Sequence, residues 1–174
     1  ELLGSSKRIG IVTHRDPDLD GIASSLALSS MFAQWGKQIL LLCSDPIPSV
    51  ASHFLGTARF LQSLPEESVR EGTDAGDTCD ELTLPELLVV VDAANLPQLG
   101  SLYDENLFVF ETTPIINIDH HASNTRFGLF NVVNSKAAAT TEIIFDLVNH
   151  WDVSLDAQLS KLLLIGLIGD TGGF

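Results

Sequence analysis

A group of potential metal ligands follows the first apolar segment of the chain. His14, Asp18 and Asp20 come directly after the apolar run 9–12, and Pro17 stiffens the turn between them. In a segment whose side chains alternate in direction, Asp18 and Asp20 would project the same way. One divalent cation could then be shared by His14 and Asp18, and another held by Asp20. A solvated turn or a helix N-cap explains the same aspartates without metal, because Asp is a favoured N-cap residue.

Later segments end in residues of the same chemical types. Asp92 follows a second apolar run, the triplet Asp119-His120-His121 follows a third, and Asp170 follows a predicted apolar helix. Each has an ordinary explanation as a helix cap, a surface pair or a loop residue. Their joint occurrence is harder to dismiss, because open α/β sheets bind ligands in the crevice at the carboxyl ends of their strands. The pattern predicts one polar cleft that collects carboxylates and imidazoles.

Short apolar runs predict the strands that position these residues. Such runs are typical of strands covered on both faces, as in a parallel sheet. They occupy residues 9–12, 39–43, 87–91 and 115–118, and a further strand signal lies at 129–133. The predicted fold class is therefore α/β, with a mostly parallel central sheet of about five strands and helices on both faces.

Helical periodicity fills the intervals between the strands. Helices are predicted over 20–35, 137–148 and 155–168, with one or two short helices in 50–64, a loop and short helix at 93–102, and helix favoured over strand at 103–110. Residues 66–84 are acidic and aperiodic, which predicts an exposed loop rather than a domain boundary. No internal repeat interrupts the pattern, so residues 1–174 are expected to form a single domain.

Composition limits the class of protein. The chain of 174 residues is 45% hydrophobic, with a mean hydropathy of +0.24, which suits one globular core. Its net charge of −14 argues against binding long nucleic acids through a basic surface. Cys43 and Cys79 lack zinc-type spacing and are compatible with a reducing compartment. Without an apolar stretch of membrane-spanning length or a leader pattern, we expect a cytoplasmic location and no membrane partner.

Four motifs together resemble the DHH phosphoesterase superfamily, and they cover nearly the whole chain in the family's order and spacing. They are His14-x-x-Pro17-Asp18-x-Asp20 with Ser24, the Asp92 that closes a Val-Val-Val run, Asp119-His120-His121, and Asp170-Thr171-Gly172. Residues 117–128 and 169–174 look most similar to the nanoRNase and oligoribonuclease branch, which includes phosphatases of adenosine 3′,5′-bisphosphate. The chain is thus identified as resembling an N-terminal DHH catalytic domain.

The sequence departs from the family pattern in two places. Leu19 stands where the family commonly has glycine, and Gly21 where it often has alanine, although no ligand type is lost. Such enzymes usually continue into a DHH-associated domain with a glycine-rich substrate loop, and nothing here matches that domain. We therefore expect the chain to be a fragment or an isolated catalytic lobe that works with a C-terminal substrate domain of the parent chain.

The resemblance implies two cations joined by one carboxylate, Asp92. The implied ligands are His14, Asp18 and Asp92 for one cation, and Asp20, Asp92, His120 and Asp170 for the other. Asp119 is expected to orient an imidazole and His121 to contact phosphate. Ser24 is expected to cap a helix or brace a loop close to the site or substrate, Asn124 to fix the loop after the histidines, and Arg126 to contact phosphate. Asp92, His120 and His121 are the residues expected to act in catalysis, whereas Asp16 is expected to be dispensable.

Hard oxygen ligands and imidazoles without thiolates suit Mn²⁺, with Mg²⁺ or Co²⁺ as alternatives. Two such cations can activate a water for in-line attack at phosphorus, so no protein nucleophile is required. The expected function is hydrolysis of short oligonucleotides or nucleoside 3′,5′-bisphosphates. Alternatives are an inorganic pyrophosphatase, a cyclic-dinucleotide phosphodiesterase, or a non-catalytic nucleotide-binding regulatory module. The expected partner is the nucleotide substrate, and the oligomeric state is open, with a homodimer among the options.

Overall fold

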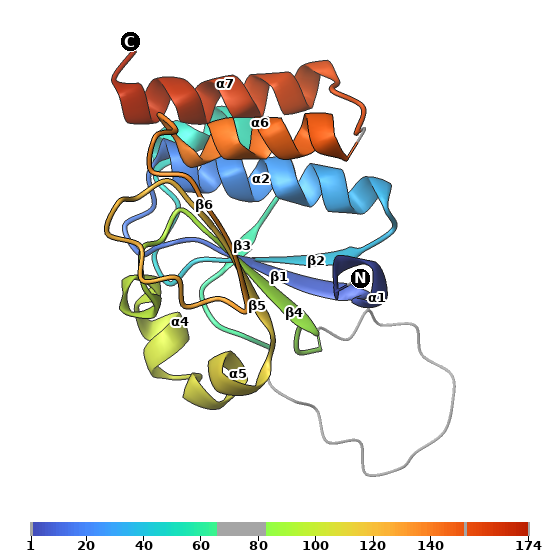
Figure 1. The fold of residues 1–174 in the computed structure, drawn as a ribbon, viewed down its shortest axis with the longest axis vertical. Helices are drawn as coiled ribbons and strands as arrows, with labels where there is room; N and C mark the ends of the chain where they lie inside the picture. The colour runs from blue at the N-terminus through green and yellow to red at the C-terminus, as the bar shows by residue number, and fades with distance from the viewer. Residues whose placement is uncertain (1, 66–82, 152, 174) are drawn as a thin grey trace.

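The computed structural model describes residues 2–65, 83–151 and 153–173, which form a three-layered α/β domain (Figure 1). The chain order is α1 (Leu2–Ser5), β1 (Arg8–Val12), α2 (Leu19–Gln34), β2 (Gln38–Leu42), η1 (Ser49–Ala51), α3 (Ser52–Leu55), β3 (Phe60–Leu61), β4 (Leu87–Val91), η2 (Leu96–Leu99), α4 (Ser101–Asp104), α5 (Leu107–Thr112), β5 (Ile115–Asp119), β6 (Phe130–Val133), α6 (Thr140–His150) and α7 (Ala157–Thr171).

Six parallel strands make the sheet, in the order β3-β2-β1-β4-β5-β6. The five predicted strands are present, and the prediction of a largely parallel sheet is confirmed. The sixth strand, β3, has only two residues paired with β2, which is too short for a periodicity signal. After β2 and β3 extend the sheet on one side of β1, the chain crosses to β4 on the other side. The switch point of the topology therefore lies between β1 and β4.

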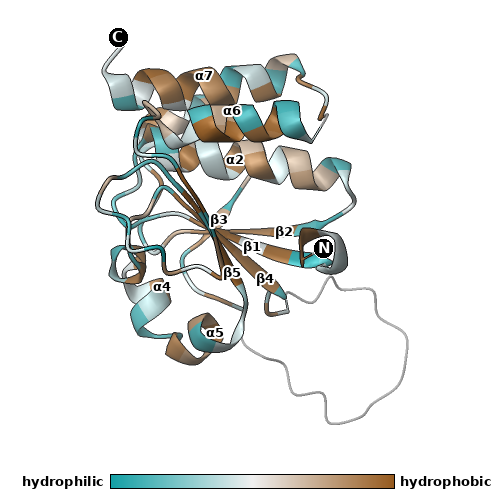
Figure 2. Ribbon diagram, in the orientation of Figure 1, coloured by the Kyte–Doolittle hydropathy of each residue, from teal (hydrophilic) through white to brown (hydrophobic). Residues whose placement is uncertain are grey.

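Helices cover both faces of the sheet, as predicted. Helices α2, α6 and α7 lie on one face and α4 and α5 on the other (Figure 1). Side chains of β4 alternate between the two faces of the sheet and so contribute to an apolar core on each face. Leu87, Val89 and Val91 face the α2 side, whereas Leu88 and Val90 face the α4 side. Figure 2 shows the strands as the most uniformly apolar part of the molecule, which is typical of a sheet covered on both faces.

Several helix limits differ from the predictions for local reasons. Helix α6 begins at Thr140 instead of 137, because Ala139 is extended with φ −160°. Helix α7 runs to Thr171, past the predicted end at 168, and ends where Gly172 adopts φ 66°. The predicted helix at 103–110 is confirmed as helical but is divided between α4 and α5. Most of the predicted loop at 66–84 lies outside the described residues.

No helix among the described residues is long and apolar enough to cross a membrane.

Candidate metal centre

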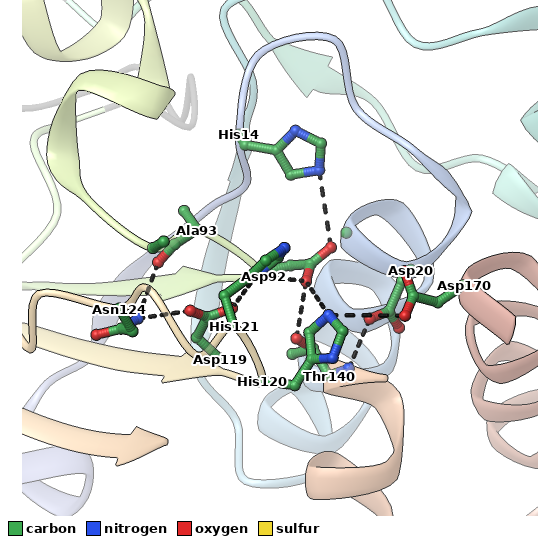
Figure 3. A network of polar contacts seen from close by, with 12 residues as sticks. His14, Asp20, Asp92, Ala93, Asp119, His120, His121, Asn124, Thr140 and Asp170 are labelled. Atoms are coloured by element: carbon green, nitrogen blue, oxygen red, sulfur yellow. Dashed lines mark hydrogen bonds and ion pairs between the residues drawn. The ribbon is translucent and has the colours of Figure 1, made fainter. Parts of the chain in front are cut away.

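The side chain of Asp92 lies at the centre of the candidate site (Figure 3). Its Oδ2 atom is 3.7 Å from Nε2 of His14, and its Oδ1 atom is 3.6 Å from Nε2 of His120. The carboxylate is almost completely buried, with a side-chain exposure of 2%. The two oxygens of one carboxylate thus face imidazoles from opposite sides, one at the end of β1 and one after β5.

Asp92 has a left-handed backbone, with φ 55°. This region is unfavourable for a side chain with a Cβ, although Asp tolerates it better than most residues. Asn117, buried on the neighbouring strand β5, donates from Nδ2 to the carbonyl oxygens of Val90 and Ala93 at 3.4 and 3.3 Å. Val90 and Ala93 lie on either side of Asp92 in the chain, so the buried amide holds the left-handed backbone of Asp92 in place.

His14 and Asp18 form one side of the site with Asp92. Nε2 of His14 is 3.7 Å from Oδ1 of Asp18, and Nδ1 is 2.6 Å from the carbonyl oxygen of Arg15. The carbonyl contact places the proton on Nδ1 in the neutral ring, which leaves Nε2 directed at the two carboxylates. Donor atoms of His14, Asp18 and Asp92 all lie within 4.8 Å of one another.

The expectation that Asp18 and Asp20 project the same way from an extended segment is wrong, because a helix begins between them. Asp18 is the N-cap of α2, and its Oδ1 accepts from the backbone N–H groups of Asp20 and Gly21 at 2.9 and 3.0 Å. Asp20 is already within the first turn of the helix. The capping explanation and the proximity to His14 therefore both hold for Asp18, because one carboxylate can serve both contacts.

His120 forms the opposite side of the site. Its Nδ1 lies 3.4 Å from the carbonyl oxygen of Ala137, and its Nε2 is 3.7 Å from Oδ2 of Asp170. Asp170 is in the last turn of α7 rather than in a loop after the helix, so its direction is determined by helix packing. The structure thus brings together Asp92, His120 and Asp170, three of the four ligands expected for the second cation.

Asp20, the fourth of these, is hydrogen-bonded to the start of α6. It is fully buried, and its Oδ2 accepts from the backbone N–H of Thr140 at 2.6 Å. Its Oδ1 accepts from both the N–H and the hydroxyl of Thr141, at 3.1 and 2.9 Å. Both carboxylate oxygens are therefore engaged by the positive end of a helix, which compensates for their burial.

The second histidine of the DHH triplet lies against both Asp92 and Asp119. Its Nδ1 is 3.9 Å from Oδ1 of Asp92, and donor atoms of Asp92, His120 and His121 lie within 4.8 Å of one another. Nδ1 of His121 is 2.7 Å from Oδ1 of Asp119, whose other oxygen accepts from Nδ2 of Asn124 at 2.6 Å. Nδ2 of Asn124 also lies within 2.7 Å of Oδ1 of Asn117, so two hydrogens are shared among several acceptors. This network links the loop after β5 to the end of β4. Asp119 thus contacts the imidazole of His121, the geometry expected of a residue that orients it.

Burial and charge shift the titration of these groups in different directions. Burial alone would lower the pKa of His14, but its contacts with Asp18 and Asp92 outweigh burial and raise the pKa to about 10. For Asp18, the His14 contact and the helix N–H groups overcome burial and lower the pKa. Burial and the neighbouring Asp92 raise the pKa of Asp20. For His121, Asp119 overcomes burial and raises the pKa.

Two other predicted residues lie at the edges of this arrangement. Ser24 is in the interior of α2 and fully buried, and its hydroxyl has no hydrogen-bond partner among the described residues. The expectation that it caps a helix or braces a loop is therefore wrong, and Asp18 provides the cap instead. Arg126 is exposed at φ 55°, with its N–H donated to Oδ1 of Asn124.

Sequence reasoning missed Thr140 and Thr141, and gave Asn117 no role. The available signal was weak: a Thr-Thr pair near a predicted helix start is common for capping reasons. Their contacts with Asp20 and Asp92 join segments more than forty positions apart, which no local pattern can reveal.

The donors present fit a divalent metal pair. Nε2 of His120 is buried and makes no hydrogen bond among the described residues, although two carboxylate oxygens lie within 3.7 Å of it. A buried imidazole nitrogen directed at carboxylates is the arrangement expected of a ligand that a cation would satisfy. Oxygen and imidazole donors without thiolates suit hard cations such as Mn²⁺ or Mg²⁺.

A parallel α/β sheet with a histidine and aspartate cluster at its switch point defines a class of α/β domains with a candidate metal site at the carboxyl ends of the strands. Within that class, this chain belongs to the DHH family: the sequence model for the DHH family, N-terminal domain, matches residues 8–167. The resemblance drawn from the four motifs is thereby confirmed.

The chain is similar to several characterised proteins. It is 32% identical over 166 residues to the bifunctional oligoribonuclease and PAP phosphatase NrnA of Thermus thermophilus, covering 95% of this chain and 44% of that protein. It is 27% identical over 187 residues to the cyclic-di-AMP phosphodiesterase GdpP of Bacillus subtilis, covering 100% of this chain and 26% of that protein.

A solved structure has the same fold. An exopolyphosphatase-related protein from Bacteroides fragilis superimposes with a TM-score of 0.76 at 20% identity, covering 99% of this chain and 48% of that one. The chain therefore spans less than half the length of each of these proteins.

Proposed function

We propose that this chain is the catalytic DHH domain of a Mn²⁺-dependent phosphoesterase that hydrolyses short oligonucleotides or nucleoside 3′,5′-bisphosphates. The observation that carries the proposal is the position of Asp92, whose two oxygens face His14 and His120 from opposite sides at 3.7 and 3.6 Å. A carboxylate in that position is suited to bridge two cations. The similarity to NrnA proteins supports the substrate class.

The proposed ligands are those implied by the motifs. His14, Asp18 and Asp92 would hold one cation, and Asp92, His120, Asp170 and Asp20 the other. When bound, the pair would lower the pKa of a shared water and stabilise charge on the entering and leaving oxygens of an in-line displacement.

The residues of the chain have separate tasks in this proposal. The carbonyl oxygens of Arg15 and Ala137 orient the rings of His14 and His120, so that each Nε2 faces the centre. Asp119 holds Nδ1–H of His121, whose side chain is 42% exposed, and so directs Nε2 toward incoming phosphate. A proton on that Nε2 would donate a hydrogen bond to a phosphate oxygen.

The substrate is tested by direct comparison. Hydrolysis of a dinucleotide, adenosine 3′,5′-bisphosphate, inorganic pyrophosphate and cyclic di-AMP would be measured with added Mn²⁺, using this chain and any longer form of the protein. We expect the first two to be cleaved fastest. Faster cleavage of pyrophosphate would identify a pyrophosphatase. Faster cleavage of cyclic di-AMP would favour the activity named for GdpP, to which the whole chain aligns.

A regulatory module that binds nucleotide without turnover is the alternative of a different class. Asp92→Ala separates the two, because a sensor could retain nucleotide binding whereas an enzyme would lose turnover. Absence of hydrolysis of every ester tried, in a full-length protein shown to hold two cations, would refute the catalytic proposal, whereas weak activity of this chain alone is expected. The substrate domain expected to follow the DHH domain stays a prediction, as does a homodimer.

A further inference from the structure

The start of α6 contacts two carboxylates that come from different parts of the fold. The backbone N–H of Thr140 donates to Oδ2 of Asp20 on α2 at 2.6 Å. The hydroxyl of the same residue donates to Oδ1 of Asp92, after β4, at 2.9 Å (Figure 3). All three residues are buried, with exposures of 0% for Thr140 and Asp20 and 3% for Asp92. One threonine therefore joins the acidic residues of two separate elements.

The contact with Asp92 involves the oxygen that also faces His120. Oδ1 of Asp92 lies 3.6 Å from Nε2 of His120, and the hydroxyl of Thr140 approaches the same oxygen. A donated hydrogen bond to a buried carboxylate restricts its rotation, because losing the bond would leave charge uncompensated. The hydroxyl thus selects the orientation in which the remaining oxygen, Oδ2, faces His14.

This helix end is closely packed on two sides. Helix α6 packs against both α2 and α7, and Gly166 of α7 approaches so closely that a Cβ there would lie 2.6 Å from Oδ1 of Asp20. Thr141 is held on the same oxygen by its N–H and hydroxyl. The start of α6 therefore supports the two carboxylates through close packing as well as through hydrogen bonds.

We propose that Thr140 is a positioning residue that sets the spacing and orientation of Asp20 and Asp92 through its N–H and its hydroxyl, and thereby tunes cation affinity. This inference rests on the proposed metal site. Thr140 itself would touch neither the cations nor the substrate. Its hydroxyl would act on the bridging carboxylate, whereas the hydroxyl of Thr141 would act on Asp20 alone.

The first experiment tests the effect of Thr140 on cation affinity, using this chain and Mn²⁺ alone. Calorimetric titration would compare wild type with Thr140→Val, which is close in shape but lacks the hydroxyl, and with Thr140→Ser, which retains it. We expect Thr140→Val to weaken Mn²⁺ binding by about tenfold to a hundredfold, the usual effect of losing a group that orients a ligand, and Thr140→Ser to restore most of it. Ser25→Ala is the matched control: its buried hydroxyl donates to the carbonyl of Gly21 and makes no hydrogen bond with a carboxylate among the described residues.

The second experiment tests the contact without metal. In chelator-treated protein, denaturant unfolding of Thr140→Val, Asp92→Asn and the double variant would give the coupling between the two side chains. Each variant changes the equilibrium constant of unfolding by some factor relative to wild type. We expect the factor for the double variant to differ more than about threefold from the product of the factors for the two single variants. If Thr140→Val does not fold, Thr140→Ala takes its place and is compared with Thr140→Ser.

The outcomes separate this inference from the proposed function. Failure of wild type to bind Mn²⁺ would refute the metal site, and the coupling measurement would still decide whether Thr140 holds Asp92. Three results would each overturn the role of Thr140. The first is Mn²⁺ affinity of Thr140→Val within twofold of wild type, and the second is an equal loss of affinity in Thr140→Val and Thr140→Ser. The third is a double variant whose unfolding constant equals the product of the two single effects. A purely structural role would lower the melting temperature of Thr140→Val and Ser25→Ala alike and leave both Mn²⁺ affinities unchanged.

Discussion

At the scale of single residues, Asp92 carries several constraints at once. It closes the buried strand β4, adopts φ 55°, has imidazole nitrogens of His14, His120 and His121 within 3.9 Å of its carboxylate, and accepts from Thr140. A backbone conformation of this kind costs of order 1–2 kcal/mol and persists only where the surroundings enforce it. Buried Asn117 supplies that enforcement from the neighbouring strand. The strained backbone and the proposed metal-binding carboxylate therefore belong to the same residue.

The titration of His14 predicts how pH affects the metal-free protein. Because its pKa is raised from 6.5 to about 10 in the folded state, its contribution to stability is fully present below pH 6.5 and is lost as pH rises through 10. We expect the melting temperature of chelator-treated protein to fall over this window. His14→Asn should flatten this dependence, and an unchanged slope in that variant would contradict the assignment.

Asp16 and Asp20 are predicted to differ sharply. Asp16 is exposed, and its contribution to the loop is a backbone N–H donated to Oδ2 of Asp45, so Asp16→Asn should leave Mn²⁺ affinity within twofold of wild type. Asp20→Asn would place an amide N–H₂ against donors of Thr140 or Thr141, costing about 1–3 kcal/mol of stability.

The measurement is Mn²⁺ titration combined with denaturant unfolding. Asp20→Asn should also lose the second cation, so the binding stoichiometry should fall from two to one. Equal effects of the two substitutions on stoichiometry would show that the opening loop has been misinterpreted.

At the scale of elements, the site depends on where three helices meet the carboxyl edge of the sheet. Helix α2 contributes Asp18 and Asp20, the end of α7 contributes Asp170, and the start of α6 holds the buried carboxylates. Figure 1 shows α2, α6 and α7 packed together on the same side of the sheet. The close approach of α7 to this centre requires a residue without a side chain at 166.

Gly166→Ala is predicted to destabilise the protein although alanine is the better helix former. The new Cβ would lie 2.6 Å from Oδ1 of Asp20 and would overlap the side chain of Thr141. Overpacking of this kind costs about 1–3 kcal/mol, more than the roughly 1 kcal/mol gained in helix propensity. Thermal unfolding measures the difference.

Gly4→Ala serves as the control, because a Cβ at Gly4 of α1 meets nothing within 4 Å. It should be neutral or slightly stabilising. A Gly166→Ala protein as stable as the Gly4→Ala control would mean that α7 can move away from Asp20 without cost.

At the scale of the whole molecule, the net charge of −14 opposes an anionic substrate. Proteins that bind nucleic acid through a basic surface lose affinity steeply as salt rises. Here, screening should weaken the long-range repulsion between protein and substrate. The field of the molecule thus favours small substrates held by local contacts.

We expect the KM for a dinucleotide to stay constant or fall as NaCl rises from about 50 to 200 mM. Steady-state kinetics at fixed Mn²⁺ would measure it, and binding of a long single strand would be followed in parallel by fluorescence anisotropy. A KM that rises tenfold, or tight binding of the long strand at low salt, would reveal a basic surface that the composition does not predict.

Much of the fold could be predicted because its signals are local. The apolar runs at 87–91 and 115–118 are buried strands, and the acidic or imidazole residues that close them lie at one edge because parallel strands share their direction. The two-residue strand β3 escaped prediction because so short a pairing leaves no periodicity. The start of α6 was placed three residues early, because the extended conformation of Ala139 depends on its surroundings.

The sequence by itself determined the chemical types at the site, the strands that deliver them and the family, because these depend on residue identity and spacing along the chain. Only the tertiary structure decided which groups meet. Asp18 is both a helix cap and a neighbour of His14, Ser24 is buried, and Thr140 joins Asp20 to Asp92. Such contacts unite residues up to 120 positions apart, and only the packing of α6 against both α2 and α7 brings them within hydrogen-bond distance.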